Sequence, residues 1–283
     1  MGNTRFSQIR PNCFADHCRL GGRGSSWLLS RSGSHTMNPH RRAFSLIELL
    51  VVMAILSVLA SILFPSIAAV SRRSHQILCL NNQKQLALAS TLYWADHQDQ
   101  CFPYLVSTQT AHTDYWFGRL ARGAEGKRQL DRTQGLLWPY LKADGLELCP
   151  SFQYQAGIYK PKALGASYGY GYNFHLAGGV GAAKRSSKVS RLASTASTAL
   201  FADAAQINDF QFPATPTRPL LEEFYYISDG PSLYANGHFR HQKRAVVSFC
   251  DGHASMASSR EGSRDERLPQ VWVARFESSI LRP

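Results

Sequence analysis

The sequence predicts an α+β protein in which one long amino-terminal helix packs on an antiparallel β-sheet domain. Three observations lead to this prediction. Residues 49–70 contain no charged side chain, and residues 74–98 place apolar side chains at helical spacing. The carboxy-terminal half contains short β-rich runs bounded by Gly, Pro and Asp. The helix should therefore have an apolar first half and an amphipathic second half.

Residues 1–43 form a basic leader before this helix. Residues 1–36 are rich in Ser, Gly and Arg without apolar periodicity, which predicts disorder or a start codon assigned too early. Translation from Met37 would leave the short leader MNPHRRA. Of the 31 basic and 19 acidic residues of the chain, seven and one lie in residues 1–43, which leaves 24 and 18 and a net charge of +6.

Residues 44–70 are predicted to cross a membrane as a helix. Roughly 20 apolar residues are enough to span the hydrocarbon core of a bilayer. The basic leader predicts a cytoplasmic amino terminus and an extracytoplasmic domain, because positive charge is retained inside. Glu48 lies just inside the apolar run, where a carboxylate costs roughly 2–3 kcal/mol. It is therefore either functional or tolerated at the level of the lipid headgroups.

Residues 41–52 (RRAFSLIELLVV) resemble the prepilin signal of type IV pilins and of the pseudopilins of type II secretion. The resemblance implies that a prepilin peptidase cuts between Ala43 and Phe44 and methylates the new amino terminus, Phe44. Alanine at position 43 departs from the glycine that the family usually has. The resemblance further implies that Glu48 pairs with the amino terminus of a neighbouring subunit, which would compensate its burial. Pro65 matches the helix-distorting proline of pilin helices, since an interior proline kinks a helix.

Residues 71–98 are predicted to continue the helix as an amphipathic spine. Side chains at alternating spacings of three and four form one stripe that would pack on the soluble domain. The stripe consists of Cys79, Asn82, Leu86, Ala89 and Tyr93.

Residues 99–283 are predicted to form the extracytoplasmic α+β domain. Gly, Pro and Asp interrupt residues 101–150 every few positions, so we expect loops with aromatic anchors there. Residues 197–203 and 222–228 are strand-like. Residues 245–250 predict a further strand, which would turn back at the two residues Asp251 and Gly252 and return over residues 253–256.

His241, nine further residues and then Asp251-Gly252 resemble the H-X9-DG domain of a bacterial subgroup of pseudopilin-like proteins. We expect His241 to hydrogen-bond the hairpin turn at 241–252 and Asp251 to accept backbone N–H groups. The alternative is a metal or general-base site in which His238, His241, Asp251 and His253 converge. Calcium is a variant that the resemblance to pseudopilins implies, although Asp251 alone supplies too few oxygen ligands.

Four cysteines follow the expected cleavage site, namely Cys79, Cys101, Cys149 and Cys250. Disulfides are permitted in an extracytoplasmic domain, and four cysteines allow three pairings. The sequence alone does not choose among them. A bond between Cys79 and Cys149 would tie the helical spine to the loop layer and is the first pairing to consider. Free buried cysteines are the alternative, which is favoured for Cys250 on its apolar strand.

These features predict a pseudopilin or minor-pilin-like subunit of a type II secretion-like or type IV pilus-like filament, and not an enzyme. Its expected partners are the prepilin peptidase, other pilin or pseudopilin subunits, the inner membrane, and a secretion or pilus assembly platform. The carboxy-terminal domain would lie in the periplasm. One alternative is a membrane-anchored periplasmic binding or metal-dependent domain that uses His241 and Asp251. A second is a DNA-uptake pilin that draws on the net charge of +6, although nucleic acid is not the expected partner.

Overall fold

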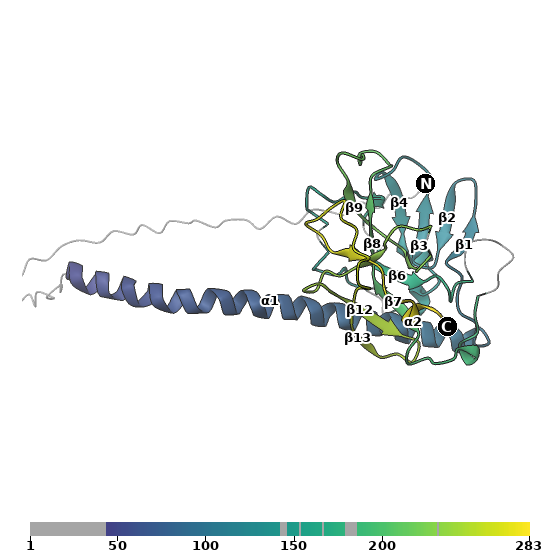
Figure 1. The fold of residues 1–283 in the computed structure, drawn as a ribbon, viewed down its shortest axis with the longest axis horizontal. Helices are drawn as coiled ribbons and strands as arrows, with labels where there is room; N and C mark the ends of the chain where they lie inside the picture. Colours follow the sequence, from purple (N-terminus) through teal and green to yellow (C-terminus); the bar gives the residue numbers. More distant parts are fainter. Residues whose placement is uncertain (1–43, 142–145, 153, 166, 179–185, 231) are drawn as a thin grey trace, which may run out of the picture. The chain divides into compact units, whose positions relative to one another are not determined.

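The computed structural model describes residues 44–141, 146–152, 154–165, 167–178, 186–230 and 232–283 (Figure 1). The chain divides into two compact units, residues 1–54 and 55–283. Helix α1 (Leu46–Asp96) contains 51 residues, begins in the first unit and continues in the second. Gln98 and Asp99 follow it with positive φ angles of 53° and 65°, a left-handed conformation that is common where helices end. The helix predicted over 44–98 is therefore present, with slightly shorter bounds.

In the second unit, the carboxy-terminal part of α1 packs on a β-sheet domain. The five residues of the predicted stripe are all buried, because that side of the helix faces the core of the domain. The amide of Gln83 also binds strand β12 (Arg244–Phe249). Its Nε2 donates to Val246 O at 3.0 Å, and its Oε1 accepts the N–H of Ser248 at 3.0 Å. The spine is thus held by both apolar contacts and hydrogen bonds.

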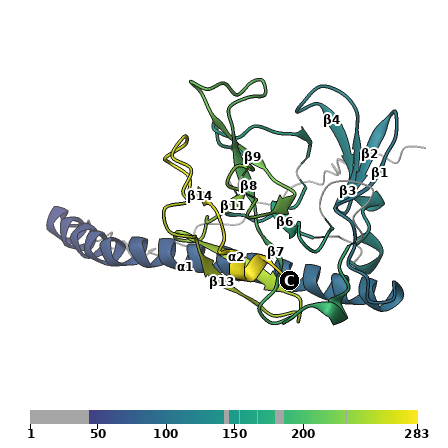
Figure 2. The ribbon, with the colours of Figure 1, turned by 45° about the vertical axis from the view of Figure 1, so that its right-hand side comes forward.

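The sheet beside α1 has five strands in the order β10-β6-β7-β12-β13. The pairs are antiparallel except for β10 with β6, which is parallel. Figure 2 shows β7 and β13 next to α1. The remaining strands of this sheet are β6 (Tyr170–Asn173), β7 (Ala199–Asp203), β10 (Tyr226–Ile227) and β13 (Ala254–Ser258).

A second five-stranded sheet, in the order β1-β2-β3-β4-β5, takes its first four strands from residues 101–150, where we expected loops. That expectation was wrong for these four strands. Each of the first four strands has four residues and is partly exposed, so the sequence contains no apolar run that would predict it. The pairs are antiparallel except for β4 with β5. The strands are β1 (Leu105–Thr108), β2 (His112–Tyr115), β3 (Gly118–Ala121), β4 (Arg128–Asp131) and β5 (Ala163–Leu164).

Two short antiparallel strand pairs and four short helices complete the described part of the domain. Strands β8 (Ala205–Asn208) and β9 (Leu220–Glu223) pair antiparallel, as do β11 (Gly237–His238) and β14 (Val273–Ala274). The helices are η1 (Arg132–Gln134), η2 (Trp138–Tyr140), η3 (Val189–Arg191) and α2 (Ser278–Leu281). A long helix followed by mostly antiparallel sheets confirms the predicted α+β class.

The hairpin between β12 and β13 forms where the sequence predicted it, but with a different turn. The N–H of Gly252 donates to Phe249 O at 3.0 Å, and the N–H of Phe249 donates to His253 O at 2.9 Å. Gly252 has a φ of 93°, whereas Asp251 is not among the positive-φ residues. The loop therefore has three residues, 250–252, and needs the left-handed conformation only at its glycine. The prediction of a two-residue turn at Asp251-Gly252 was therefore wrong.

A buried ion cluster ties β9 to the segment before β5. Lys160 Nζ donates to Glu222 Oε1 and to Glu125 Oε2, both at 2.9 Å. Glu222 Oε2 accepts the side-chain amides of Gln206 at 2.8 Å and Asn208 at 2.7 Å. A buried charge is tolerated when its hydrogen-bonding positions are filled in this way. The cluster therefore fixes the β8–β9 hairpin against the rest of the domain.

Candidate functional site

The expected cleavage site lies between Ala43 and Phe44. Ala43 and the rest of the leader lie outside the described residues, so cleavage there stays a prediction. Glu48 Oε2 accepts the backbone N–H of Ser45 at 2.9 Å, and α1 starts at the next residue, Leu46. Ser45 and Glu48 thus have the spacing of a capping box, in which the glutamate satisfies an N–H at the helix start. Glu48 has a local structural role besides the one that the prepilin resemblance implies.

The first half of α1 is suited to lipid. It contains a window of mean hydropathy 2.7, none of which is buried in the structure, and it is long and apolar enough to cross a membrane. Ser61 Oγ donates to Val58 O and Ser66 Oγ donates to Leu63 O, both at 2.7 Å. These hydroxyls therefore find acceptors within their own helix, as a membrane segment requires. The helix is continuous through position 65, and a kink at Pro65 stays a prediction.

Cys79 of α1 and Cys149 form a disulfide, with their Cα atoms 5.6 Å apart. This is the pairing that we considered first from the sequence. Both residues are buried, and the bond joins the spine to the segment before β5. Cys101 and Cys250 are free and buried. The disulfide closes a loop with a sequence separation of 70 residues, so it restricts the unfolded chain strongly.

Replacing both Cys79 and Cys149 by Ala should lower the free energy of unfolding by about 4 kcal/mol, because the unfolded chain regains the entropy of that loop. Urea unfolding of the detergent-solubilised chain would measure the loss. Reductant should bring the wild type to the level of the double variant and leave the variant unchanged. If reductant frees both thiols without changing the midpoint of unfolding, the bond does not stabilise the domain.

Asp203, at the end of β7, forms the centre of a buried polar cluster. Its Oδ1 accepts Arg240 Nη2 at 2.6 Å, and its Oδ2 accepts the N–H of Val246 at 2.8 Å. The Nε2 of His241 lies 3.3 Å from the same Oδ2 and 3.8 Å from Cys149 Sγ. The histidine of the H-X9-DG pattern therefore faces Asp203 and the disulfide, not the hairpin turn that we expected it to bind.

The backbone at His241 makes the two-residue turn that we had placed at Asp251. The N–H of His241 donates to Arg244 O at 2.9 Å, and the N–H of Arg244 donates to His241 O at 3.1 Å. Between them, Gln242 and Lys243 have positive φ angles of 55° and 63°. Residues with a Cβ atom pay roughly 1–2 kcal/mol each in this left-handed region. Asn and Gly are preferred there, so Gln-Lys gave no turn signal in the sequence.

Asp251 accepts a backbone N–H as expected. Its Oδ1 accepts the N–H of His253 at 3.1 Å and lies 2.6 Å from His253 Nδ1. Burial opposes ionisation of Asp251, but these contacts with His253 outweigh it and lower the pKa of the carboxyl. Asp251 and His253 thus form a small pair at the surface of the hairpin, whereas His241 is buried beside Asp203.

The described residues contain one group of three Cys, His or acidic side chains whose donor atoms lie within 4.8 Å of one another, namely Cys79, Cys149 and His241. Its two sulfurs are joined in the disulfide, and a thiolate is the form of cysteine that binds metal. The four residues His238, His241, Asp251 and His253 are not gathered into such a group. The metal role considered for His241 and Asp251 therefore has no assembled ligand set of this kind in the described residues.

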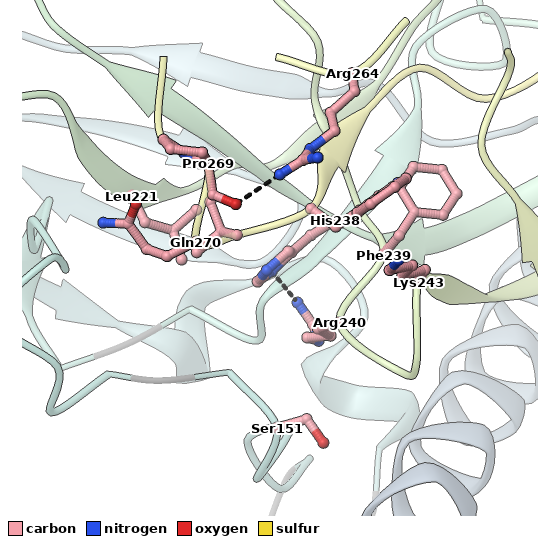
Figure 3. A pocket seen from close by; sticks show the side chains of 11 residues that line it. Ser151, Leu221, His238, Phe239, Arg240, Lys243, Arg264, Pro269 and Gln270 are labelled. Atoms are coloured by element: carbon pink, nitrogen blue, oxygen red, sulfur yellow. Dashed lines mark hydrogen bonds between the residues drawn. The ribbon is translucent and has the colours of Figure 1, made fainter. Parts of the chain in front are cut away.

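A cavity of about 410 Å³ lies beside the Gln242-Lys243 turn. Figure 3 shows Arg264 hydrogen-bonded to Pro269 on one side of it and Arg240 hydrogen-bonded to His238 on the other. Arg240 Nη1 lies 3.3 Å from His238 Nδ1. An arginine can only donate, so this nitrogen accepts and the other ring nitrogen, Nε2, carries the proton. Burial lowers the pKa of His238 well below its usual value, and electrostatic interactions with Arg240 and His241 lower it further.

This cavity was not expected from the sequence, in which residues 237–244 read GHFRHQKR. This segment contains five basic or histidine side chains. Three of them, His238, Arg240 and Lys243, line the cavity. The density of basic residues there was the available signal. The contribution of Arg264 from the loop after β13 had no such signal, because its approach depends on the tertiary fold.

A G-x-S-x-G spacing, which marks the nucleophile of many hydrolases, occurs at residues 165–169, so the interpretation of the sequence as lacking this pattern was wrong. It connects β5 to β6, both strands, whereas the hydrolase nucleophile lies on a strand-to-helix turn. Ser167 is 3% exposed, and its hydroxyl is buried. Its N–H donates to Glu223 Oε2 at 3.0 Å. A substrate cannot reach this hydroxyl as placed, so the serine fits a structural role.

Comparison with known families gives one match. Residues 38–64 match the family described as the prokaryotic N-terminal methylation motif. No curated protein and no solved structure matches the chain. The match supports a prepilin-like signal, and with it a pilin- or pseudopilin-like subunit that is processed by prepilin peptidase and assembles with other pilin subunits. Together with the apolar half of α1, it indicates a membrane-anchored protein.

Proposed function

We propose that the chain is a pseudopilin or minor-pilin-like subunit that assembles into a type II secretion-like or type IV pilus-like filament. The observation that carries this proposal is the methylation motif at residues 38–64, at the start of an exposed apolar helix. In a membrane, lipid covers the apolar surface of α1. In a filament, neighbouring copies of the helix would replace the lipid.

The proposed arrangement places the basic leader in the cytoplasm and the domain that begins after α1 in the periplasm. Positive charge before the apolar run favours this orientation. Ala54, Ser57, Ala60 and Ser61 would allow neighbouring helices to approach closely, since small residues are common at helix contacts in membranes. The role is mechanical and associative, so the proposal assigns no catalytic residue to the domain. The partners are the prepilin peptidase, other subunits and an assembly platform in the inner membrane.

Co-expression with a prepilin peptidase should yield a chain that begins at methylated Phe44. Intact mass spectrometry of the membrane-extracted protein would show the loss of every residue up to Ala43 and the gain of one methyl group. Ala43→Gly should be cut at least as fast, because the peptidase family accepts glycine there. Ala43→Leu should be cut more slowly, since its larger side chain occupies the cleavage position.

Expression without the peptidase is the control, and the leader should then remain. A chain that keeps residues 37–43 in the presence of active peptidase would contradict the proposal. The helix would then be an ordinary signal anchor, and the function would have to lie in the domain.

A further inference from the structure

We propose that the cavity beside the Gln242-Lys243 turn binds a small organic anion that carries a carboxylate or phosphate group. The site lies in the β domain and is independent of the apolar helix and of filament assembly. It would give the protein a ligand-binding function in addition to its role as a subunit.

Positively charged side chains line the cavity. Arg240, Lys243 and Arg264 line it, and in the described part of the chain none of the eleven lining residues is Asp or Glu. Asp203 offsets the charge of Arg240. Arg264 Nε lies 3.6 Å from the exposed Glu266, and Lys243 has no carboxylate within ion-pairing distance among the described residues. A hollow lined by one sign of charge concentrates ions of the opposite sign.

The two less compensated cations, Lys243 and Arg264, both lie against the ring of Trp272. Lys243 Nζ lies 4.8 Å from the centre of the Trp272 ring, and Arg264 Cζ lies 4.3 Å from it. Stacking on an aromatic ring holds each cation in place without neutralising it. Two positive groups from separate loops are therefore held against the same ring at the cavity wall.

The backbone turn that carries Lys243 is in the left-handed conformation. Both central residues of its turn have positive φ angles of 55° and 63°, although neither is Gly, Asn or Asp. Strain of this kind persists where the surrounding structure maintains it and is concentrated at binding and active sites. The turn places the lysine beside Trp272, so the strained conformation has a consequence for the cavity.

Residues that line the cavity also have hydrogen-bond donors without partners in the described part of the chain. The Nε atoms of Arg240 and Arg264 are buried and have no hydrogen-bond partner among the described residues, and His238 carries its proton on Nε2. Guanidinium groups pair well with carboxylate and phosphate oxygens. Phe239, Val271 and Trp272 supply apolar surface at the same cavity. Its volume of about 410 Å³ falls in the range of small-molecule sites.

Isothermal titration calorimetry on the full chain in non-ionic detergent would test this site. Citrate is the carboxylate probe, glycerol phosphate is the phosphate probe, and glycerol is the uncharged control. We expect one saturable site per chain for at least one of the two anions, none for glycerol, and weaker binding at higher salt. The anion that binds more tightly identifies which oxyanion the cavity prefers.

Lys243→Gly is the decisive variant. Glycine adopts positive φ without strain, so the melting temperature should not fall, yet binding should weaken about tenfold because one charged contact is lost. Gln242→Gly is the matched control, since it relieves the same turn and keeps the lysine, and it should bind as the wild type does. Arg264→Gln should also weaken binding about tenfold.

Two results would overturn the proposal. One is the absence of saturable binding of either anion to the folded wild type. The other is binding that Lys243→Gly and Arg264→Gln leave unchanged while both variants stay folded, because the anion would then bind elsewhere on the basic surface.

Discussion

Asp203→Ala should lower the free energy of unfolding by about 3–5 kcal/mol, the usual effect of removing one partner from a buried ion pair. The side chain of Asp203 is fully buried, and that of Arg240 is 2% exposed. Without the carboxylate, the guanidinium would remain buried without a counter-charge. The N–H of Val246 would also lose its acceptor. The loss should appear as a lower urea midpoint of the detergent-solubilised chain.

Two variants separate this explanation from a general effect of losing an acid. Asp251→Ala removes a carboxylate of the H-X9-DG pattern itself, but Asp251 lies at the surface, so its loss should cost less than about 1 kcal/mol. Asp203→Ala combined with Arg240→Met removes both buried charges and should recover part of the stability that Asp203→Ala loses. Equal losses for Asp203→Ala and Asp251→Ala would show that burial of the ion pair is not the cause.

The Asp203 cluster also shows which parts of the structure the sequence could not predict. His241 was recognised from its spacing to Asp251, but its side chain meets Asp203, which lies 38 residues earlier in the sequence. That contact exists because β12 pairs with β7. The sequence of either strand alone does not indicate which distant strand it pairs with. Local sequence therefore identified the histidine and missed its partner.

Local features were predicted well because their signals are local. The helix follows from an uncharged run and a helical stripe, both contained within α1. The β12–β13 hairpin follows from a β-rich run and a glycine that needs positive φ. By contrast, β2 (His112–Tyr115) has four partly exposed residues, which is too short a pattern to separate a strand from a loop. The cavity was missed for a related reason, since Lys243 and Arg264 belong to separate loops.

Glu48→Ala should nearly abolish contacts between copies of the processed chain in the membrane. If the proposed function is correct, the Glu48 carboxylate pairs with the amino group of Phe44 on a neighbouring subunit. A carboxylate within the apolar region is costly alone and far less so when paired. Removing it takes away the group that makes assembly favourable at this depth. Crosslinking between cysteines introduced at positions 54 and 57 of α1 would measure the contacts.

The helix cap formed by Glu48 is a second explanation for a loss of contacts in Glu48→Ala, and the experiment has to separate it from the loss of charge. Glu48 also accepts the N–H of Ser45, so its loss removes a helix cap worth about 1 kcal/mol. Glutamine serves as well as glutamate at this position of a capping box, but it carries no charge. Glu48→Gln therefore keeps the cap and loses the ion pair.

Comparing Glu48→Ala with Glu48→Gln shows whether Glu48 acts through the helix cap or through its charge. If the carboxylate pairs with an amino terminus, Glu48→Gln should fail to crosslink as completely as Glu48→Ala, while mass spectrometry shows that both are cut before Phe44. If Glu48→Gln crosslinks at the wild-type level, the charge has no part in assembly and the role of Glu48 is to cap the helix at Ser45. Glu48 would then act only at the start of the helix, where its carboxylate is tolerated at the membrane surface. Contacts between subunits would depend on the small residues of α1 instead.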